Sequence, residues 1–131
     1  MRMIVAGGGT GGHLFPGIAV ASAIMEQVPD SRVLFIGTSR LLDQQALAGL
    51  GFELAALQCG GVKGLSFAER LRSLLMMPGS VAEAMRILHR FKPDLVFGVG
   101  GYVTGPVLLA AKLMGIPIAI HEQNSVPGMA N

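Results

Sequence analysis

The chain of 131 residues has few charged residues, few aromatic residues, no tryptophan and one cysteine. The single Cys59 allows no internal disulfide bond, which favours a reducing cytoplasm, and no cysteines or histidines cluster around it, so we expect no metal site. Nucleic-acid binding is disfavoured because only 5% of the residues are aromatic and the basic residues form no stripe. Charged residues make up 14%, against roughly 25% in an average soluble domain. This composition suits a parallel sheet that helices cover on both faces.

The chain also lacks a continuous apolar run suited to export or membrane insertion. Residues 3–25 carry no charge, but a glycine cluster, a histidine and a proline interrupt them, so they do not form the apolar region of a signal peptide. Residues 95–111 are uncharged as well, yet they contain four glycines and Pro106, which make a poor spanning helix. We therefore expect a soluble fold with one domain over residues 1–131.

The most informative stretch covers residues 2–23. Apolar residues 3–6 predict a buried strand, and five glycines follow within six residues. These glycines allow the backbone to turn sharply and expose its amide groups. Pro16 suits the first turn of the helix that should come next. The combination predicts an anion site, because free N–H groups and the positive end of the helix dipole meet there.

The G-x-G-x-x-G pattern that begins at Gly7 also satisfies the dinucleotide fingerprint, which should be followed by an acidic residue at the end of the second strand. The second predicted strand, residues 32–36, ends without a carboxylate, and Asp30 lies at its other end. The missing acid argues against NAD. Arg40 keeps an NADP-dependent oxidoreductase domain as an alternative.

Strand and helix signals alternate along the whole chain. We predict strands at 3–6, 32–36, 52–57, 94–98 and 116–121, and further helices at 41–50, 66–77, 80–91 and 105–114. Alternation of this kind is typical of parallel strands joined by right-handed helical crossovers. The sequence therefore predicts an α/β fold with a Rossmann-like doubly wound parallel sheet.

Particular residues mark the expected helix ends. Ser66 and Ser80 each open a sequence with capping-box spacing. Residues 78–79, a proline and a glycine, should separate the two helices that these boxes begin. Thr104 is the expected N-cap of the last helix, and Gly115 should end it.

Three polar segments follow predicted strands, at residues 7–13, 98–102 and 121–124. The carboxyl ends of parallel strands meet at one edge of a sheet, and ligands bind there near the point where strand order reverses. The titratable and hydrogen-bonding residues expected at this rim are His13, Tyr102, His121, Glu122 and Asn124. His121 ends a buried strand, which favours a structural histidine whose hydrogen bonds are satisfied.

Residues 8–17, 98–106 and 121–124 read GGTGGHLFPG, GVGGYVTGP and HEQN. These motifs, in this order, resemble the MurG family of bacterial UDP-N-acetylglucosamine transferases, and the resemblance covers the whole chain. It implies the N-terminal half of a two-domain GT-B glycosyltransferase, with the C-terminal donor-binding domain absent from these residues. The implied reaction is an inverting transfer of N-acetylglucosamine from UDP-N-acetylglucosamine to the C4 hydroxyl of lipid I. Lipid I is undecaprenyl-diphospho-N-acetylmuramoyl-pentapeptide, and the product is lipid II, used in peptidoglycan synthesis.

The resemblance also implies the setting of this hexosyltransferase. It needs no cofactor and no metal, and it is peripheral on the cytoplasmic face of the plasma (inner) membrane. An anionic membrane surface is one expected partner, and other cell-wall synthesis proteins are candidate partners. The fragment alone should be inactive.

Ligand-binding roles carry over residue by residue. The positions that match the donor contacts for UDP-N-acetylglucosamine are Thr10, Gly11, Gly12 and Asn124. The positions expected to bind the acceptor are Gly9, His13, Gly100, Gly101, Tyr102 and Glu122. The acceptor's diphosphate suits glycine-rich turns. Tyr102 could instead be a partly buried turn residue.

An inverting transfer needs a base near the attacking hydroxyl. His13 is the leading candidate, because a helix N-terminus favours the neutral, proton-accepting imidazole. Glu122 is the rival base, or the group that orients His13. A third reading leaves His13 as a helix cap or a ligand contact without a role in proton transfer.

Charge is concentrated in residues 61–92, where six basic and two acidic residues give a net charge of +4, against +2 for the whole chain. Anionic lipid attracts a basic and apolar patch, with about 1 kcal/mol for each surface Lys or Arg. The predicted membrane contacts are Lys63, Phe67, Arg70, Leu71, Leu74 and Leu75. A core helix with solvated arginines is the alternative. A non-catalytic subunit that recruits a separate donor-binding chain to the membrane is a further alternative function.

Overall fold

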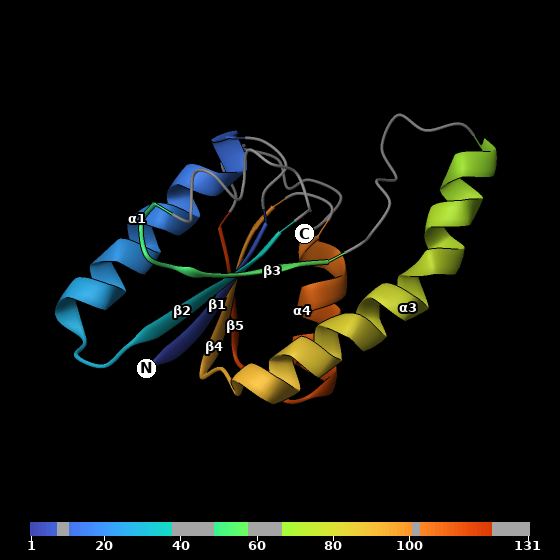
Figure 1. The fold of residues 1–131 in the computed structure, drawn as a ribbon. Helices are drawn as coiled ribbons and strands as arrows, with labels where there is room; N and C mark the ends of the chain where they lie inside the picture. Colours follow the sequence, from blue (N-terminus) through green and yellow to red (C-terminus); the bar gives the residue numbers. More distant parts are fainter. Residues whose placement is uncertain (8–10, 38–48, 58–66, 101–102, 122–131) are drawn as a thin grey trace.

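The computed structural model describes residues 1–7, 11–37, 49–57, 67–100 and 103–121, with side chains described outside 11–14 and 67–77. The described part forms a sheet of five parallel strands: β1 (Arg2–Gly7), β2 (Arg32–Gly37), β3 (Glu53–Ala56), β4 (Leu95–Gly100) and β5 (Ile118–Ile120). Their order is β3-β2-β1-β4-β5 (Figure 1). β1 lies between β2 and β4, so the strand order reverses there. The predicted Rossmann-like doubly wound sheet is confirmed.

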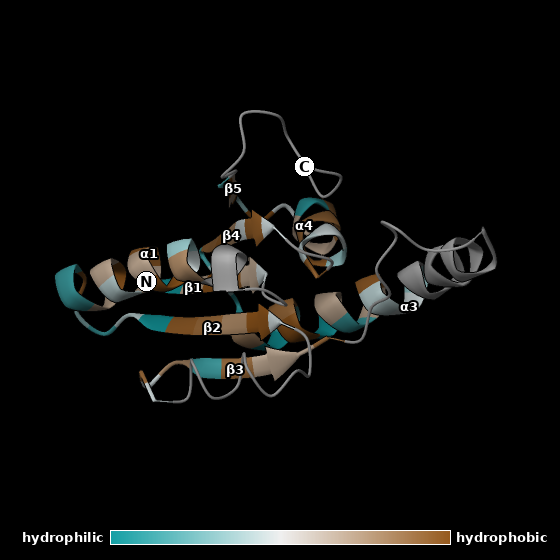
Figure 2. Ribbon diagram, turned by 90° about the horizontal axis from the view of Figure 1, so that it is seen from above, coloured by the Kyte–Doolittle hydropathy of each residue, from teal (hydrophilic) through white to brown (hydrophobic). Residues whose placement is uncertain are grey.

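Helices cover the sheet on both faces. α1 (Gly11–Gln27) lies on one face against β1, β2 and β4. α3 (Phe67–Phe91) and α4 (Thr104–Leu113) pack together on the other face (Figures 1 and 2). Because side chains alternate along a strand, β1 sends Met3 and Val5 to the core under α1, and Ile4 and Ala6 to the core under α3 and α4.

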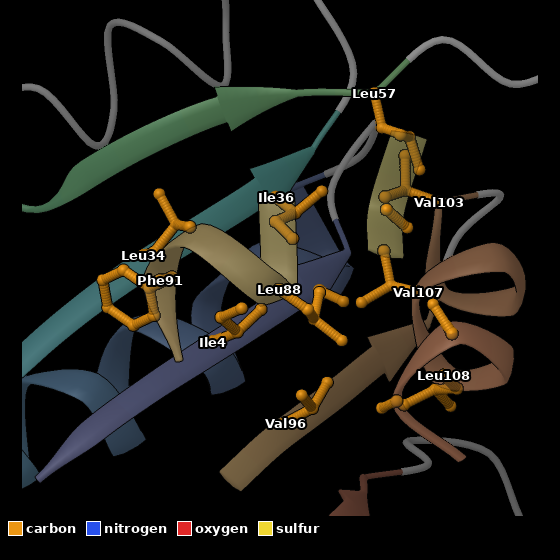
Figure 3. Packing of buried hydrophobic residues seen from close by; sticks show 14 of the residues in the cluster. Ile4, Leu34, Ile36, Leu57, Leu88, Phe91, Val96, Val103, Val107 and Leu108 are labelled. Carbon is orange, nitrogen blue, oxygen red and sulfur yellow. The ribbon is translucent and has the colours of Figure 1, made fainter. Parts of the chain in front are cut away.

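The larger core lies between the central strands and the helix pair (Figure 3). Its members from α3 recur at helical spacing, at Val81, Ala84, Leu88 and Phe91. The other labelled residues of this core are Ile4, Leu34, Ile36, Leu57, Val96, Val103, Val107 and Leu108. A central strand that is buried on both faces needs apolar residues throughout, which accounts for the low charge content of the chain.

α3 is one helix, so the prediction that residues 78–79 separate two helices is wrong. It continues through Pro78, which lacks the N–H that would bond to the carbonyl of Leu74. Ser80 lies inside the helix and is buried, and it therefore does not cap a helix start. Ser66 lies outside the described residues, directly before the first residue of α3.

Packing explains why α3 continues past the proline. Pro78 and Gly79 are exposed, so the ring of Pro78 meets solvent and not a neighbouring element. The turns that follow place Val81, Ala84 and Leu88 in the core, and this burial outweighs one missing helical hydrogen bond. The N-terminal end of α3 lies away from the sheet (Figure 1).

The two edges of the sheet differ in chemistry. At one edge, Glu53 of β3 accepts two hydrogen bonds from the guanidinium of Arg32 on β2, at 2.7 and 3.0 Å. At the other edge, β5 exposes Ile118 and Ile120. The predicted helix at 41–50 lies outside the described residues except for Gly49 and Leu50, which form a turn. Within the described ranges, no helix is long and apolar enough to cross a membrane.

Candidate functional site at the carboxyl edge of the sheet

The site is built where β1, β4 and β5 end. Gly7 pairs with Gly100, and the backbone N–H of His121 donates to the carbonyl of Gly98 at 2.8 Å. α1 begins at the same edge of the sheet, which is the upper edge in Figure 1. Three segments that are far apart in the sequence therefore reach one rim, as predicted from the order of strands and helices.

A β-bulge shapes the centre of this rim. The register between β1 and β4 pairs Ala6 with Gly98 and then Gly7 with Gly100, so Val99 is an extra residue on β4. A Cβ atom on Gly7 would lie 2.3 Å from Cγ2 of Val99 and 2.8 Å from the carbonyl oxygen of Gly100. Only glycine therefore fits at the end of β1. Bulges often occur beside functional sites, where they redirect the backbone.

Gly100 ends β4 in a left-handed conformation, with φ of +103°. This conformation favours glycine, because a Cβ atom would be strained there. The predicted glycine turn at 98–102 therefore begins later than expected, since Gly98, Val99 and Gly100 all belong to β4. Gly98 has a different role: a Cβ atom there would lie 3.0 Å from Cγ2 of Thr104.

Thr104 connects the two central strand ends. It is the first residue of α4 and fully buried, and the residue before it, Val103, occupies the N-cap position without a side-chain hydrogen bond. The prediction of Thr104 as the N-cap is therefore wrong. Its hydroxyl lies 3.1 Å from the carbonyl oxygen of Ala6 and 2.9 Å from that of Gly100. Sequence reasoning missed this contact because it joins residues 98 positions apart.

The start of α1 supplies backbone N–H groups to the rim. Gly11, Gly12 and His13 form its first turn, where N–H groups have no intrahelical partner and the dipole favours an anion. Pro16 lies in the second turn, so its prediction in the first turn is wrong. A Cβ atom on Gly17 would lie 2.7 Å from Cγ1 of Val5, so α1 lies directly against β1.

The structure describes only some of the other predicted site residues. His13 and the donor candidates Gly11 and Gly12 have a described backbone but no described side chain, and Gly100 is fully described. The candidates that lie outside the described residues are Gly9, Thr10, Lys63, Gly101, Tyr102, Glu122 and Asn124. The predicted membrane contacts Phe67, Arg70, Leu71, Leu74 and Leu75 belong to the first turns of α3, of which only the backbone is described.

His121, which directly follows β5, is one of the residues predicted at the rim. It is half-buried at the end of β5, and its Nδ1 atom is buried without a hydrogen-bond partner in the part of the chain that the structure describes. The prediction of a satisfied structural histidine is therefore not confirmed among the described residues. A buried nitrogen in this state normally requires a partner, and its position at the rim makes a ligand or a neighbouring segment the natural source.

The described part of the rim offers backbone amides. Among the described residues, no group of three or more His, Cys, Asp or Glu side chains could hold a metal ion. A helix start and a glycine at a strand end are suited to phosphate oxygens, which bind to backbone N–H groups without a cation. The arrangement fits a diphosphate ligand.

Comparisons with known proteins show what this chain is similar to. The UDP-N-acetylglucosamine--N-acetylmuramyl-(pentapeptide) pyrophosphoryl-undecaprenol N-acetylglucosamine transferase of Syntrophus aciditrophicus is 50% identical over 131 residues, which are 100% of this chain and 36% of the relative. The transferase of the same name from Desulfotalea psychrophila is 52% identical over 130 residues, 99% of this chain and 35% of that protein. The chain thus spans about a third of the length of these curated relatives.

A solved structure supports the same relationship. The crystal structure of Acinetobacter baumannii MurG matches with a TM-score of 0.84 and 35% identity, and the match covers 99% of this chain and 37% of that one. The resemblance to the MurG family that the three motifs indicate is therefore confirmed. Residues 3–131 match the model of the glycosyltransferase family 28 N-terminal domain, and the chain belongs to this family.

Proposed function

We propose that this chain is the N-terminal, acceptor-binding half of an inverting GT-B hexosyltransferase that converts lipid I to lipid II. The observation that carries the proposal is the 50% identity, over the whole chain, to a transferase whose name states both the N-acetylglucosamine group and the pyrophosphoryl-undecaprenol acceptor. That relative is longer than the matched part. The proposal therefore includes a C-terminal domain that completes the donor site, and "the full-length enzyme" below means this chain together with that domain.

The acceptor's diphosphate is the ligand that the rim suits best. The first turn of α1, whose N–H groups have no partner within the helix, and Gly100 at the end of β4 reach the same edge of the sheet. Both are anion-binding features that need no metal. The proposed acceptor contacts are Gly9, His13, Gly100, Gly101, Tyr102 and Glu122. The proposed contacts to UDP-N-acetylglucosamine are Thr10, Gly11, Gly12 and Asn124.

The proposed chemistry is a single displacement at the anomeric carbon of the donor sugar. The C4 hydroxyl oxygen of lipid I forms a bond to that carbon while the bond to the UDP oxygen breaks, so the configuration inverts. The hydroxyl proton passes to His13, with Glu122 as the rival base or as the group that orients His13. Hydrogen-bond donors around the departing diphosphate stabilise its developing charge.

Membrane attachment is the second part of the proposal. Lipid I is held in a bilayer, so the enzyme must approach a membrane surface, and we place it at the cytoplasmic face of the inner membrane as a peripheral protein. The first turns of α3 supply all the proposed contacts except Lys63, because they carry basic and apolar residues and lie away from the sheet (Figure 1). Basic residues attract anionic lipid and apolar residues insert at the interface. The proposed contacts are Lys63, Phe67, Arg70, Leu71, Leu74 and Leu75.

A transfer assay tests the proposed activity. The full-length enzyme is incubated with radiolabelled UDP-N-acetylglucosamine and lipid I in detergent micelles, with the Syntrophus aciditrophicus relative as a positive control. We expect labelled lipid II from both proteins and none from residues 1–131 alone. A folded full-length enzyme that forms no product, under conditions in which the relative does, would contradict the proposal.

The alternatives give different results in the same samples. An NADP-dependent oxidoreductase domain would bind NADPH in a calorimetric titration, whereas the proposed transferase would not. A non-catalytic recruiting subunit would show transfer only after a separate donor-binding chain is added. Transfer by the full-length enzyme alone excludes that arrangement.

A further inference from the structure

Thr104 holds a position that ordinary helix capping does not explain. Its side chain is fully buried, and its hydroxyl lies between carbonyl oxygens of two different strands, 3.1 Å from Ala6 and 2.9 Å from Gly100. Ala6 is the residue before the last of β1, and Gly100 is the last residue of β4. One side chain therefore contacts the backbone at the carboxyl ends of both strands.

The bulge explains why a hydroxyl is needed there. The ladder between β1 and β4 shifts register between Ala6 and Gly7, and regular pairing is interrupted at such a shift. The hydroxyl of Thr104 has one hydrogen to donate, and it serves two carbonyl oxygens within hydrogen-bond distance. The backbone at this shift is thus held by a side chain in addition to the strand ladder.

Packing fixes the orientation of Thr104. Its methyl group lies 3.0 Å from the position that a Cβ atom on Gly98 would occupy, so the methyl group packs closely on β4. A β-branched side chain has few χ1 rotamers, and a packed methyl group selects one of them. The hydroxyl is therefore directed toward the two carbonyl groups.

We propose that Thr104 is a positioning residue for acceptor binding, which holds the carboxyl ends of β1 and β4 at one fixed separation. This inference rests on the proposed function, in which the rim at these strand ends binds the acceptor's diphosphate. A ligand with two linked phosphates needs its binding groups at the right spacing. A displacement of about 1 Å between the two strand ends can lower the rate about 100-fold even when no ligand contact is removed.

Two substitutions separate the hydroxyl from the shape of the side chain. Thr104→Val keeps the branched shape and removes the hydroxyl, whereas Thr104→Ser keeps the hydroxyl and removes the methyl group. In the full-length enzyme we expect Thr104→Val to lower kcat/KM for lipid I by about 10- to 100-fold, mainly through KM for lipid I. Thr104→Ser should restore kcat/KM for lipid I to within about threefold of the unmodified enzyme.

Val107→Ala is the matched structural control. Val107 is also fully buried in α4, one turn further on, but its side chain has no hydroxyl that could bond to either strand end. Val107→Ala should lower Tm and leave the KM values for lipid I and for UDP-N-acetylglucosamine unchanged in the folded fraction. If Thr104→Val behaves in the same way, Thr104 has only a structural role and the inference is wrong.

A second variant covers the case in which Thr104→Val does not fold. Gly98→Ala brings a Cβ atom to 3.0 Å from Cγ2 of Thr104, which displaces the side chain and keeps its hydroxyl. Gly98→Ala should raise KM for lipid I, and an unchanged KM for lipid I would overturn the inference.

If the unmodified enzyme transfers no sugar, the proposed function fails. Amide hydrogen exchange at Gly7 and Gly100 then still tests Thr104, since exchange should be faster in Thr104→Val than in Thr104→Ser, and equal rates would overturn the inference.

Discussion

Gly7 and Val99 approach each other so closely that a Cβ atom on Gly7 would lie 2.3 Å from Cγ2 of Val99. The contact joins the end of β1 to the extra residue of β4 at the bulge, so the last residue of β1 must fit the shape of the neighbouring strand. The requirement for glycine at this position is therefore set by packing before any ligand is considered.

The first prediction tests that contact. Gly7→Ala should lower the free energy of unfolding by about 3 kcal/mol, because the added methyl group also meets the backbone oxygen of Gly100, which cannot move independently. Urea denaturation followed by circular dichroism measures the change. Gly49→Ala is the control, since a Cβ atom there has no atom within 4 Å. Equal stability of the two variants would show that the strand ends can separate.

A second prediction concerns the proline inside α3. Pro78→Ala should raise the free energy of unfolding by about 1–3 kcal/mol, because it restores the hydrogen bond to the carbonyl of Leu74 at an exposed position. Ala82→Gly, at another exposed position of the same helix, should lower it by about 1 kcal/mol. Urea denaturation again gives both values. A loss of stability in Pro78→Ala would mean that the proline makes a favourable contact.

The third prediction is that the ion pair at the β3 edge makes the free energy of unfolding depend on pH. The hydrogen bond from Arg32 holds the pKa of the Glu53 carboxyl below its usual value. A carboxyl with a lowered pKa in the folded state stabilises the fold above its unfolded pKa of about 4.3, and this contribution is lost as the pH falls through the folded pKa. Both side chains are about half exposed, so the effect should be small and sensitive to salt.

The urea concentration at the midpoint of unfolding is measured at pH values from 7 to 3. Glu53→Gln should unfold at a lower urea concentration than the unmodified chain at pH 7, and the two midpoints should converge at pH 3. Glu26→Gln removes an exposed carboxylate of α1 but not this ion pair, and it serves as the control. Parallel curves for Glu53→Gln and the unmodified chain would argue against a contribution from the pair.

A fourth prediction addresses proton transfer. His13→Ala in the full-length enzyme should lower kcat by about 10²–10⁴-fold if His13 is the base, with KM for lipid I little changed. His89→Ala, an exposed histidine of α3, is the control and should leave kcat unchanged. A change confined to KM would make His13 a binding residue and would favour Glu122 as the base.

The fifth prediction concerns the membrane. The double substitution Leu74→Ser and Leu75→Ser should reduce co-sedimentation of the full-length enzyme with vesicles that contain anionic lipid, because it removes apolar area from the first turns of α3. The same change at Leu109 and Leu113, two exposed leucines of α4, is the control and should have no effect. Equal sedimentation of both double variants would contradict the proposed contact.

The sequence predicted the parts of the fold that depend on local pattern. Apolar runs gave all five strands to within a few residues, and Gly115 ends α4 as expected, with φ of +72°. Alternation of strands and helices also predicted the rim, because parallel strands end at one edge of the sheet. These features follow from neighbours in the chain.

The errors have a different physical origin. Pro78 and Ser80 read locally as the end of one helix and the start of another, but burial of Val81 and Leu88 keeps α3 continuous. Thr104 reads as an N-cap, yet its partner Ala6 lies 98 positions away. No local pattern records such contacts.

The unequal edges of the sheet have a practical consequence for handling the protein. Edge strands with unpaired backbone groups are the usual starting points of aggregation, and natural proteins protect them with charge or with short length. The ion pair of Arg32 and Glu53 protects the β3 edge, whereas β5, the other edge among the described strands, exposes Ile118 and Ile120. When the protein aggregates at high concentration, the first intermolecular strand pairing should therefore form along β5, and Ile120→Lys should delay the onset of turbidity.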